Sequence, residues 1–184
     1  KTPDKTESGI RLITAKNIRS GYIDFDPAEY ISEEDYDDWM TRGIPEKGDL
    51  LFTTEAPLGK IAVIDFEDKF ALAQRAINFR LLGEVDSYFV QYFIMSIIFQ
   101  NVLLNKATGM TATGIKSTIL KKTPFPIPPL KEQKRIVGKI DELFSWCDDL
   151  KEKLSHSQQS DQRLLEALVN GVSKNEQVDS DGKS

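Results

Sequence analysis

The chain has 184 residues, of which 40% are hydrophobic and 29% charged, so its length and composition predict one globular domain with an appendage. Its formal net charge of −5 argues against indiscriminate nucleic-acid binding, and its single cysteine excludes a disulfide within one chain. The longest apolar stretch, residues 88–104, contains polar side chains and predicts a core helix rather than a membrane span. No secretory signal is visible, so a cytoplasmic location is expected.

Short strand patterns dominate the first half of the chain. Strands are predicted over residues 10–14, 18–25, 49–54, 60–66 and 70–82, where β-forming residues alternate or cluster between turns. Between the second and third of these segments, Ser32 and Asp35 form a capping-box-like start for a short acidic helix through Met40.

Helical patterns follow. Ser87 is expected to cap a helix that runs to about Asn105. Residues 109–114 predict a small-residue loop, and residues 115–120 predict one or two helical turns. A β-rich head with helical additions belongs to the α+β class.

A proline-rich strip then leads into a long amphipathic helix. Its prolines fix φ and remove four backbone donors, which favours an extended strip; they are Pro124, Pro126, Pro128 and Pro129. Pro129 can serve as the first helical residue, and Glu132 lies where the helix dipole favours an anion.

From Ile136 onward, ten positions follow an unbroken four-three alternation, and eight of them are apolar or Cys. This pattern predicts a seam that faces another helix, with Cys147 buried in it and with Ser157 and Asp161 as polar interruptions. The predicted helix–helix interface comprises Ile136, Ile140, Leu143, Cys147, Leu150, Leu154, Leu164 and Leu168.

Three regions are therefore expected. They are a head over residues 1–129, a long helix over residues 130–170 and a disordered tail over residues 171–184, which is poor in apolar residues.

Charge is unevenly distributed along the chain. Residues 24–38 hold eight acidic residues and no base, whereas residues 87–131 hold five lysines and no acid. A polyanion would be repelled from the first region and attracted to the second, although such asymmetry is also common on solvated surfaces.

Several polar residues are candidate DNA contacts. The loop over residues 109–114 offers the hydroxyls of Thr111 and Thr113, with Lys116 close by, and is otherwise a plain turn. Gln74 and Arg75 lie between apolar strand residues and can make bidentate contacts to base edges. The alternative for Arg75 is a structural role as the partner of a buried carboxylate.

Isolated basic residues complete the set of candidates. Lys60, at a strand start, can reach a phosphate or be solvated, and the loop containing Lys16, Asn17 and Arg19 is similarly ambiguous. Lys106 is one of the five lysines of residues 87–131. The predicted DNA-binding set is Lys16, Arg19, Lys60, Gln74, Arg75, Lys106, Thr111, Thr113 and Lys116.

No catalytic pattern is present. The one Pro-Pro pair lies in Ile-Pro-Pro-Leu and lacks the aromatic residue that would stack on a flipped base. No Gly-x-Gly loop follows a strand, and the single histidine, His156, has no metal-ligand spacing around it. The sequence predicts a non-catalytic chain without a metal site.

The strip P-I-P-P-L-K-E-Q-K-R-I-V, followed by K-I-D-E-L and C-D-D-L, resembles the specificity subunits of type I restriction–modification systems. The resemblance extends upstream to G-I-R-L-I-T-A-K-N-I, G-D-L-L-F-T-T, L-G-K-I-A, A-Q-R-A-I and G-M-T-A-T-G-I. In this order, the motifs cover residues 9 to about 170.

The resemblance implies a DNA sequence-recognition subunit that reads one half of a bipartite target in double-stranded DNA. It also implies docking of modification (methyltransferase) subunits, which supply S-adenosylmethionine, and of a restriction subunit. No cofactor is expected in this chain itself. The family pattern has two recognition domains and two helices, whereas one of each is present here, so a second copy or second half is expected to pair through the long helix.

Two alternatives remain open from the residues. One is a coiled-coil assembly protein whose head binds protein. The other is the recognition domain of a larger DNA-modifying or DNA-cleaving enzyme.

Overall fold

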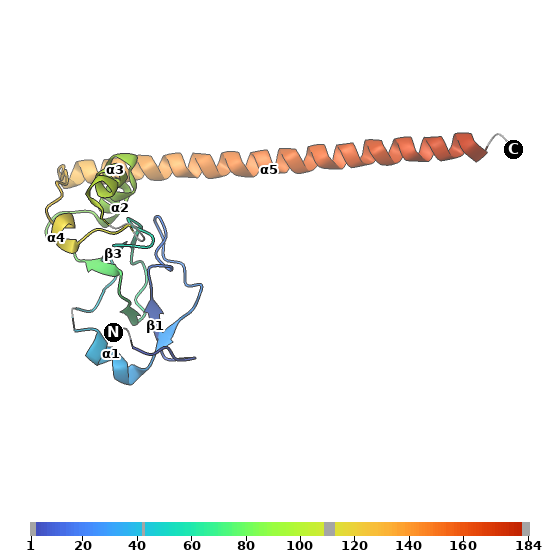
Figure 1. Cartoon of the computed structure of the whole chain (residues 1–184). Helices are drawn as coiled ribbons and strands as arrows, with labels where there is room; N and C mark the ends of the chain where they lie inside the picture. Colours follow the sequence, from blue (N-terminus) through green and yellow to red (C-terminus); the bar gives the residue numbers. More distant parts are fainter. Residues whose placement is uncertain (1–2, 42, 109–112, 182–184) are drawn as a thin grey trace. The chain divides into compact units, whose positions relative to one another are not determined.

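The computed structural model describes residues 3–41, 43–108 and 113–181 (Figure 1), with the backbone alone for residue 164 and residues 167–181. Contacts divide the chain into residues 1–137, called the head below, and residues 138–184, called the arm. The predicted boundary at residue 129 precedes this division because the first turns of the long helix pack within the head.

In the described residues of the head, six short strands form two sheets. The first sheet has the order β2 (Tyr30–Ile31), β1 (Ile10–Ile13) and β5 (Phe70–Leu72), with β1 antiparallel to β2 and parallel to β5. The second sheet is antiparallel and has the order β4 (Ile61–Val63), β3 (Leu50–Thr53) and β6 (Ala76–Phe79). Together with the helices, these sheets confirm the α+β class.

The helices are α1 (Glu33–Trp39), α2 (Ser87–Met95), α3 (Ile97–Lys106), α4 (Ser117–Leu120) and α5 (Leu130–Asp181). Ser32 caps α1 as predicted, since its hydroxyl accepts a hydrogen bond from the backbone N–H of Asp35 at 3.1 Å. The same hydroxyl donates to the Asp35 carboxylate at 2.7 Å.

The buried strand β3 organises the core of the head. Leu50 and Phe52 face a cluster formed with α2, α3 and the first turns of α5, whereas Leu51 faces the first sheet, as the period of two in a strand requires. A third cluster, around Tyr36 of α1, covers the other side of β1 and β5. Figure 1 shows the resulting order within the head: α2 and α3, then β3, then β1, then α1.

Gln133 fixes the start of α5 inside the head. Its side chain is fully buried, and its Oε1 accepts a hydrogen bond from the backbone N–H of Asp86 at 2.8 Å. Its Nε2 donates to the carbonyl oxygens of Pro128 at 2.7 Å and Glu84 at 3.2 Å. One amide therefore connects the proline strip, α5 and the N-terminus of α2.

Three element predictions were wrong. Residues 18–25 form a loop with a single bridge between Ile18 and Ile23, because the buried Asn17 amide binds the carbonyl oxygens of Asp24 and Pro27 and pulls the segment into a turn. The strand predicted over 70–82 is divided between the two sheets at Arg75, whose φ is 71°. The helix predicted over 87–105 bends by 68° at Ser96, which caps both α2 and α3.

Smaller differences concern the cap of α2 and the bounds of the long helix. Asp86, rather than Ser87, caps α2. The long helix, predicted over residues 130–170, has the bounds Leu130–Asp181, and the disordered tail over residues 171–184 stays a prediction. Within the described part of the chain, no helix by itself has the length and apolarity of a membrane span; α2 and α3 taken together do, by length and composition only.

A buried carboxylate joins the start of β3 to the end of β6. Asp49 is 4% exposed and accepts hydrogen bonds from Asn78 at 2.8 Å, from Arg80 at 2.9 and 3.0 Å and from the Glu46 N–H at 3.0 Å. Burial by itself raises the pKa of Asp49, but the hydrogen bonds from Arg80, Asn78 and Glu46 outweigh burial and hold that pKa below its ordinary value.

We expect Asp49→Ala to lower the free energy of unfolding by about 2–3 kcal/mol at pH 7, because hydrogen bonds to a charged group are lost. Since the folded-state pKa is depressed, this contribution is complete above the unfolded-state pKa of about 3.9 and is lost as the pH falls through the lower folded-state value. Denaturant unfolding between pH 7 and pH 3 measures it. Asp68→Ala, at an exposed carboxylate, is the control, and a pH-independent difference for Asp49→Ala would contradict the prediction.

Candidate nucleic-acid interface

Three loop segments meet where β3 ends. They are residues 54–60, 73–75 and 113–116, called the loop cluster below. The backbone N–H and the hydroxyl of Thr54 both donate to the carbonyl oxygen of Arg75, at 2.9 and 3.1 Å. The carbonyl oxygen of Thr54 accepts from the N–H of Ile115 at 2.9 Å. Thr54, the residue after the buried strand β3, thus forms hydrogen bonds to two loops that are distant from it in the sequence.

An ion pair lies in the loop cluster. Arg75 Nε is 3.0 Å from Glu55 Oε1, and the two side chains are 61% and 39% exposed. Gly114 packs directly against Glu55, since a Cβ at residue 114 would lie 3.0 Å from the Glu55 Cβ and 3.3 Å from the Thr54 carbonyl oxygen. The pair is therefore a surface feature with a closely packed backbone beneath it.

Gln74 and Arg75 were predicted to lie in a strand, but they do not. They occupy the turn between β5 and β6 because the hydrogen bonds from Thr54 hold Arg75 in the left-handed region. The alternative role for Arg75, pairing with a buried carboxylate, does not hold either, because Glu55 is partly exposed. Gln74 is exposed in the same turn. Glu55 was not among the predicted residues, since a lone carboxylate in a loop carries no pattern of its own.

Lys60 connects the loop cluster to the loop over residues 14–27. Its Nζ donates to the Ser20 hydroxyl at 3.0 Å, and the neighbouring Gly21 N–H donates to the Ile61 carbonyl oxygen at 2.9 Å. Arg19, on the same loop, forms an ion pair with Asp24 at 3.2 Å. The Asp26 N–H and Arg19 together hold the pKa of Asp24 below its ordinary value.

The remaining DNA-contact candidates are dispersed. Lys16, Thr113 and Lys116 are exposed, and Lys116 immediately precedes α4. Lys106 is half-buried and donates to the Thr123 hydroxyl at 3.1 Å, which directs it toward the proline strip. Thr111 lies outside the described residues. The structure therefore brings together Lys60, Gln74, Arg75, Thr113 and Lys116 around the end of β3, with Lys16 and Arg19 on the adjoining loop.

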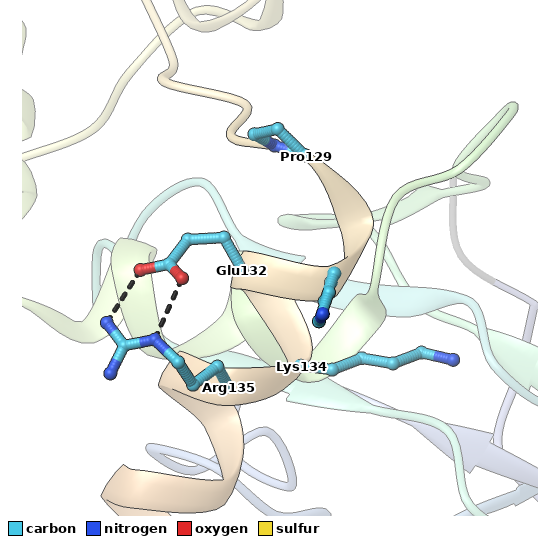
Figure 2. A pocket seen from close by; sticks show the side chains of 5 residues that line it. Pro129, Glu132, Lys134 and Arg135 are labelled. Atoms are coloured by element: carbon cyan, nitrogen blue, oxygen red, sulfur yellow. Dashed lines mark hydrogen bonds and ion pairs between the residues drawn. The ribbon is translucent and has the colours of Figure 1, made fainter.

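The first turns of α5 also carry basic side chains, those of Lys131, Lys134 and Arg135. Figure 2 shows a shallow surface pocket in which Glu132 and Arg135 face one another, while Lys134 points away from them. Arg135 donates to both carboxylate oxygens of Glu132, at 2.7 and 2.8 Å, and this lowers the pKa of Glu132. In the part of the chain that the structure describes, no three His, Cys, Asp or Glu side chains gather as metal ligands would.

The arm exposes much of its predicted seam. Leu143, Leu150 and Leu154 are 46%, 63% and 60% exposed, and Cys147 is exposed in the single chain rather than buried. At the start of the seam, Ile136 packs against the core of the head and Ile140 is half-buried. The side chains of Leu164 and Leu168 lie outside the described residues.

Known proteins resemble this chain in both sequence and fold. A model described as type I restriction modification DNA specificity domain matches residues 7–157. The type I restriction enzyme EcoAI specificity subunit of Escherichia coli is 27% identical over 174 residues, which cover 91% of this chain and 29% of the relative. The EcoBI specificity subunit of Escherichia coli is 24% identical, over 90% of this chain and 35% of the relative.

The fold is also found in solved structures. The crystal structure of the HsdS subunit from Thermoanaerobacter tengcongensis superimposes with a TM-score of 0.65 and 24% identity, over 85% of this chain and 40% of that chain. The chain thus spans about a third of the length of the curated relatives it matches.

Proposed function

The chain belongs to the type I restriction modification DNA specificity domain family, and we propose that its head reads one half of a bipartite DNA target. The observation that carries this proposal is the family match, which spans the head and enters the arm, over residues 7–157. The relatives are named as specificity subunits of type I restriction enzymes, which supports recognition rather than catalysis as the role of this chain.

The loop cluster supplies suitable chemistry for duplex binding. Lys60 and Lys116 are compact cations that suit phosphate oxygens, whereas Gln74 and Arg75 carry flat paired donors that suit base edges. The segments of the loop cluster hold three basic residues, Lys60, Arg75 and Lys116, and one acidic residue, Glu55. Local charge can therefore attract DNA although the net charge of the chain is −5.

The proposed partners follow from the family. Modification subunits would supply S-adenosylmethionine and the methyl-transfer chemistry, and a restriction subunit would join them. The head alone would bind duplex DNA weakly, and specific binding would require the modification subunits. We place the assembly in the cytoplasm.

The arm would pair with an equivalent helix from a second copy or a second half of the protein and fix the gap between two half-sites. An antiparallel pairing would bury the exposed leucines, each contributing about 1.5–3 kcal/mol. The four-three spacing of the seam supports this geometry.

The proposal is tested by replacing a phosphate-type contact. Lys116→Ala should weaken binding to all duplexes by similar factors and make the log–log salt slope, about −4 to −5 for the wild type, shallower by about one. Fluorescence anisotropy with the complete complex, at several salt concentrations, measures both quantities. Lys153→Ala, an exposed lysine of the arm, is the control. Binding that is independent of salt, or absent even with the modification subunits present, would contradict the proposed function.

A further inference from the structure

The Glu55–Arg75 pair has an unusual backbone beneath it. Arg75 has a φ of 71°, and Ala56, next to Glu55, has a φ of 44°. Residues other than Gly seldom occupy this left-handed region, and they persist there only where surrounding contacts hold them. Here the contacts are the two hydrogen bonds from Thr54 to the Arg75 carbonyl oxygen. A glycine would adopt the turn more readily, so the presence of an arginine points to a role for its side chain.

The pair also leaves its outer groups available. Nε of Arg75 lies 3.0 Å from Glu55, the Arg75 side chain is 61% exposed, and within the described residues its two terminal amino groups donate no hydrogen bond. The second carboxylate oxygen of Glu55, Oε2, lies beside Gly114, where a Cβ would be 3.4 Å away. Glycine at residue 114 therefore lets this loop pack against Glu55 without a side chain that would crowd the carboxylate.

We propose that Glu55 and Arg75 together read one C·G base pair, Arg75 through the guanine edge and Glu55 through the cytosine amino group. This inference rests on the proposed function. Arginine donates in bidentate fashion to guanine O6 and N7, and glutamate accepts from cytosine N4. Guanine O6 and cytosine N4 are hydrogen-bonded to each other and so lie about 3 Å apart. Because the Arg75 and Glu55 side chains lie in contact through Nε, a terminal amino group of Arg75 and the carboxylate of Glu55 can meet neighbouring groups of one base pair.

Charge favours a base over a phosphate at this position. A carboxylate beside the guanidinium cancels its charge and would repel a phosphate, whereas the cytosine amino group is a donor that a carboxylate accepts. The competing explanation is a surface ion pair that only joins two loops. Exposed ion pairs contribute little to stability, and such a role gives no reason for an arginine in the left-handed region.

The test is methylation-site mapping on random-sequence duplexes, with the full chain assembled with its modification subunits. We expect the wild-type half-site to contain a C·G pair that both Arg75→Ala and Glu55→Ala relax, each by at least about tenfold and at the same position. The double variant should discriminate this base pair about as well as the less selective of the two single variants, because Glu55 and Arg75 act as a unit. Glu55→Gln, which retains an accepting oxygen, should keep part of the preference.

Two controls distinguish a loss of base recognition from a loss of folding. The Glu132–Arg135 pair of α5 (Figure 2) is also an exposed Glu–Arg contact, and Glu132→Ala with Arg135→Ala should leave the preferred bases unchanged. Arg75→Gly should relax the same base pair while keeping the wild-type melting temperature, because glycine fits a φ of 71°.

The outcomes distinguish the inference from the function on which it rests. Unchanged base preference in both single variants, or changes at two different positions, would overturn the reading of a C·G pair while leaving DNA recognition intact. A wild-type complex that methylates no defined sequence would overturn the proposed function and this inference with it.

Discussion

Replacing Gln133 by Leu should lower the free energy of unfolding of the head by about 3–5 kcal/mol. Leucine has a similar volume but cannot bond the Asp86 N–H or the carbonyl oxygens of Glu84 and Pro128, which the wild-type amide satisfies. Each buried group left without a partner costs about 1–3 kcal/mol. Urea unfolding monitored by circular dichroism and by the fluorescence of Trp39, which lies in the head, measures the change.

Gln158→Leu is the matched control for this prediction. Gln158 is exposed on the same helix, so its replacement should change stability by less than about 0.5 kcal/mol. Equal effects of the two substitutions would show that the buried amide does not hold the start of α5 in the head.

Replacing Leu150 and Leu154 together by Ala should raise the dissociation constant for self-association through the arm by at least about a thousandfold. Both side chains are about 60% exposed in the single chain and belong to the predicted seam. The interface between two arms would lose four leucine side chains, two from each chain. Each contributes about 1.5–3 kcal/mol when buried, and every 1.4 kcal/mol of binding free energy changes the dissociation constant tenfold. Sedimentation equilibrium from nanomolar to high micromolar concentration measures the association.

Glu152→Ala with Gln159→Ala is the control for the arm, because these exposed residues lie on the side of the helix opposite the seam. They should leave the dissociation constant within a few-fold of the wild type. A wild-type chain that is strictly monomeric up to high micromolar concentration would show that the arm serves a different partner, or pairs with a second half of a longer protein.

Local sequence patterns predicted the elements whose limits depend on nearby residues. The cap at Ser32, the strand around residues 50–53 and a long helix from residue 130 were predicted correctly, although Pro129 precedes α5 and is not its first residue. In each case the determining interaction lies within a few residues: a hydroxyl three positions before an amide, a run of apolar side chains, or a proline that lacks an N–H.

The candidate site was predicted less well. Lys60, Gln74, Arg75 and Lys116 were selected by residue type, and the structure places them around the end of β3. Lys106 instead turns to Thr123, and Glu55 was not predicted at all. Residue type indicates what a side chain can bind, whereas its partner depends on which distant loop reaches it.

The sequence by itself determined the family, the α+β class and the long amphipathic helix, because motif order and apolar spacing are properties of the chain read in one dimension. Only the tertiary structure decided where continuous patterns break. Residues 70–82 have the apolar content of one strand, but Thr54, far away in the sequence, bonds Arg75 and divides that segment between two sheets. The same contact places Arg75 beside Glu55. Backbone angles imposed by a distant hydrogen-bond donor leave no periodic signal, so such breaks and the pairings they create emerge only from the folded chain.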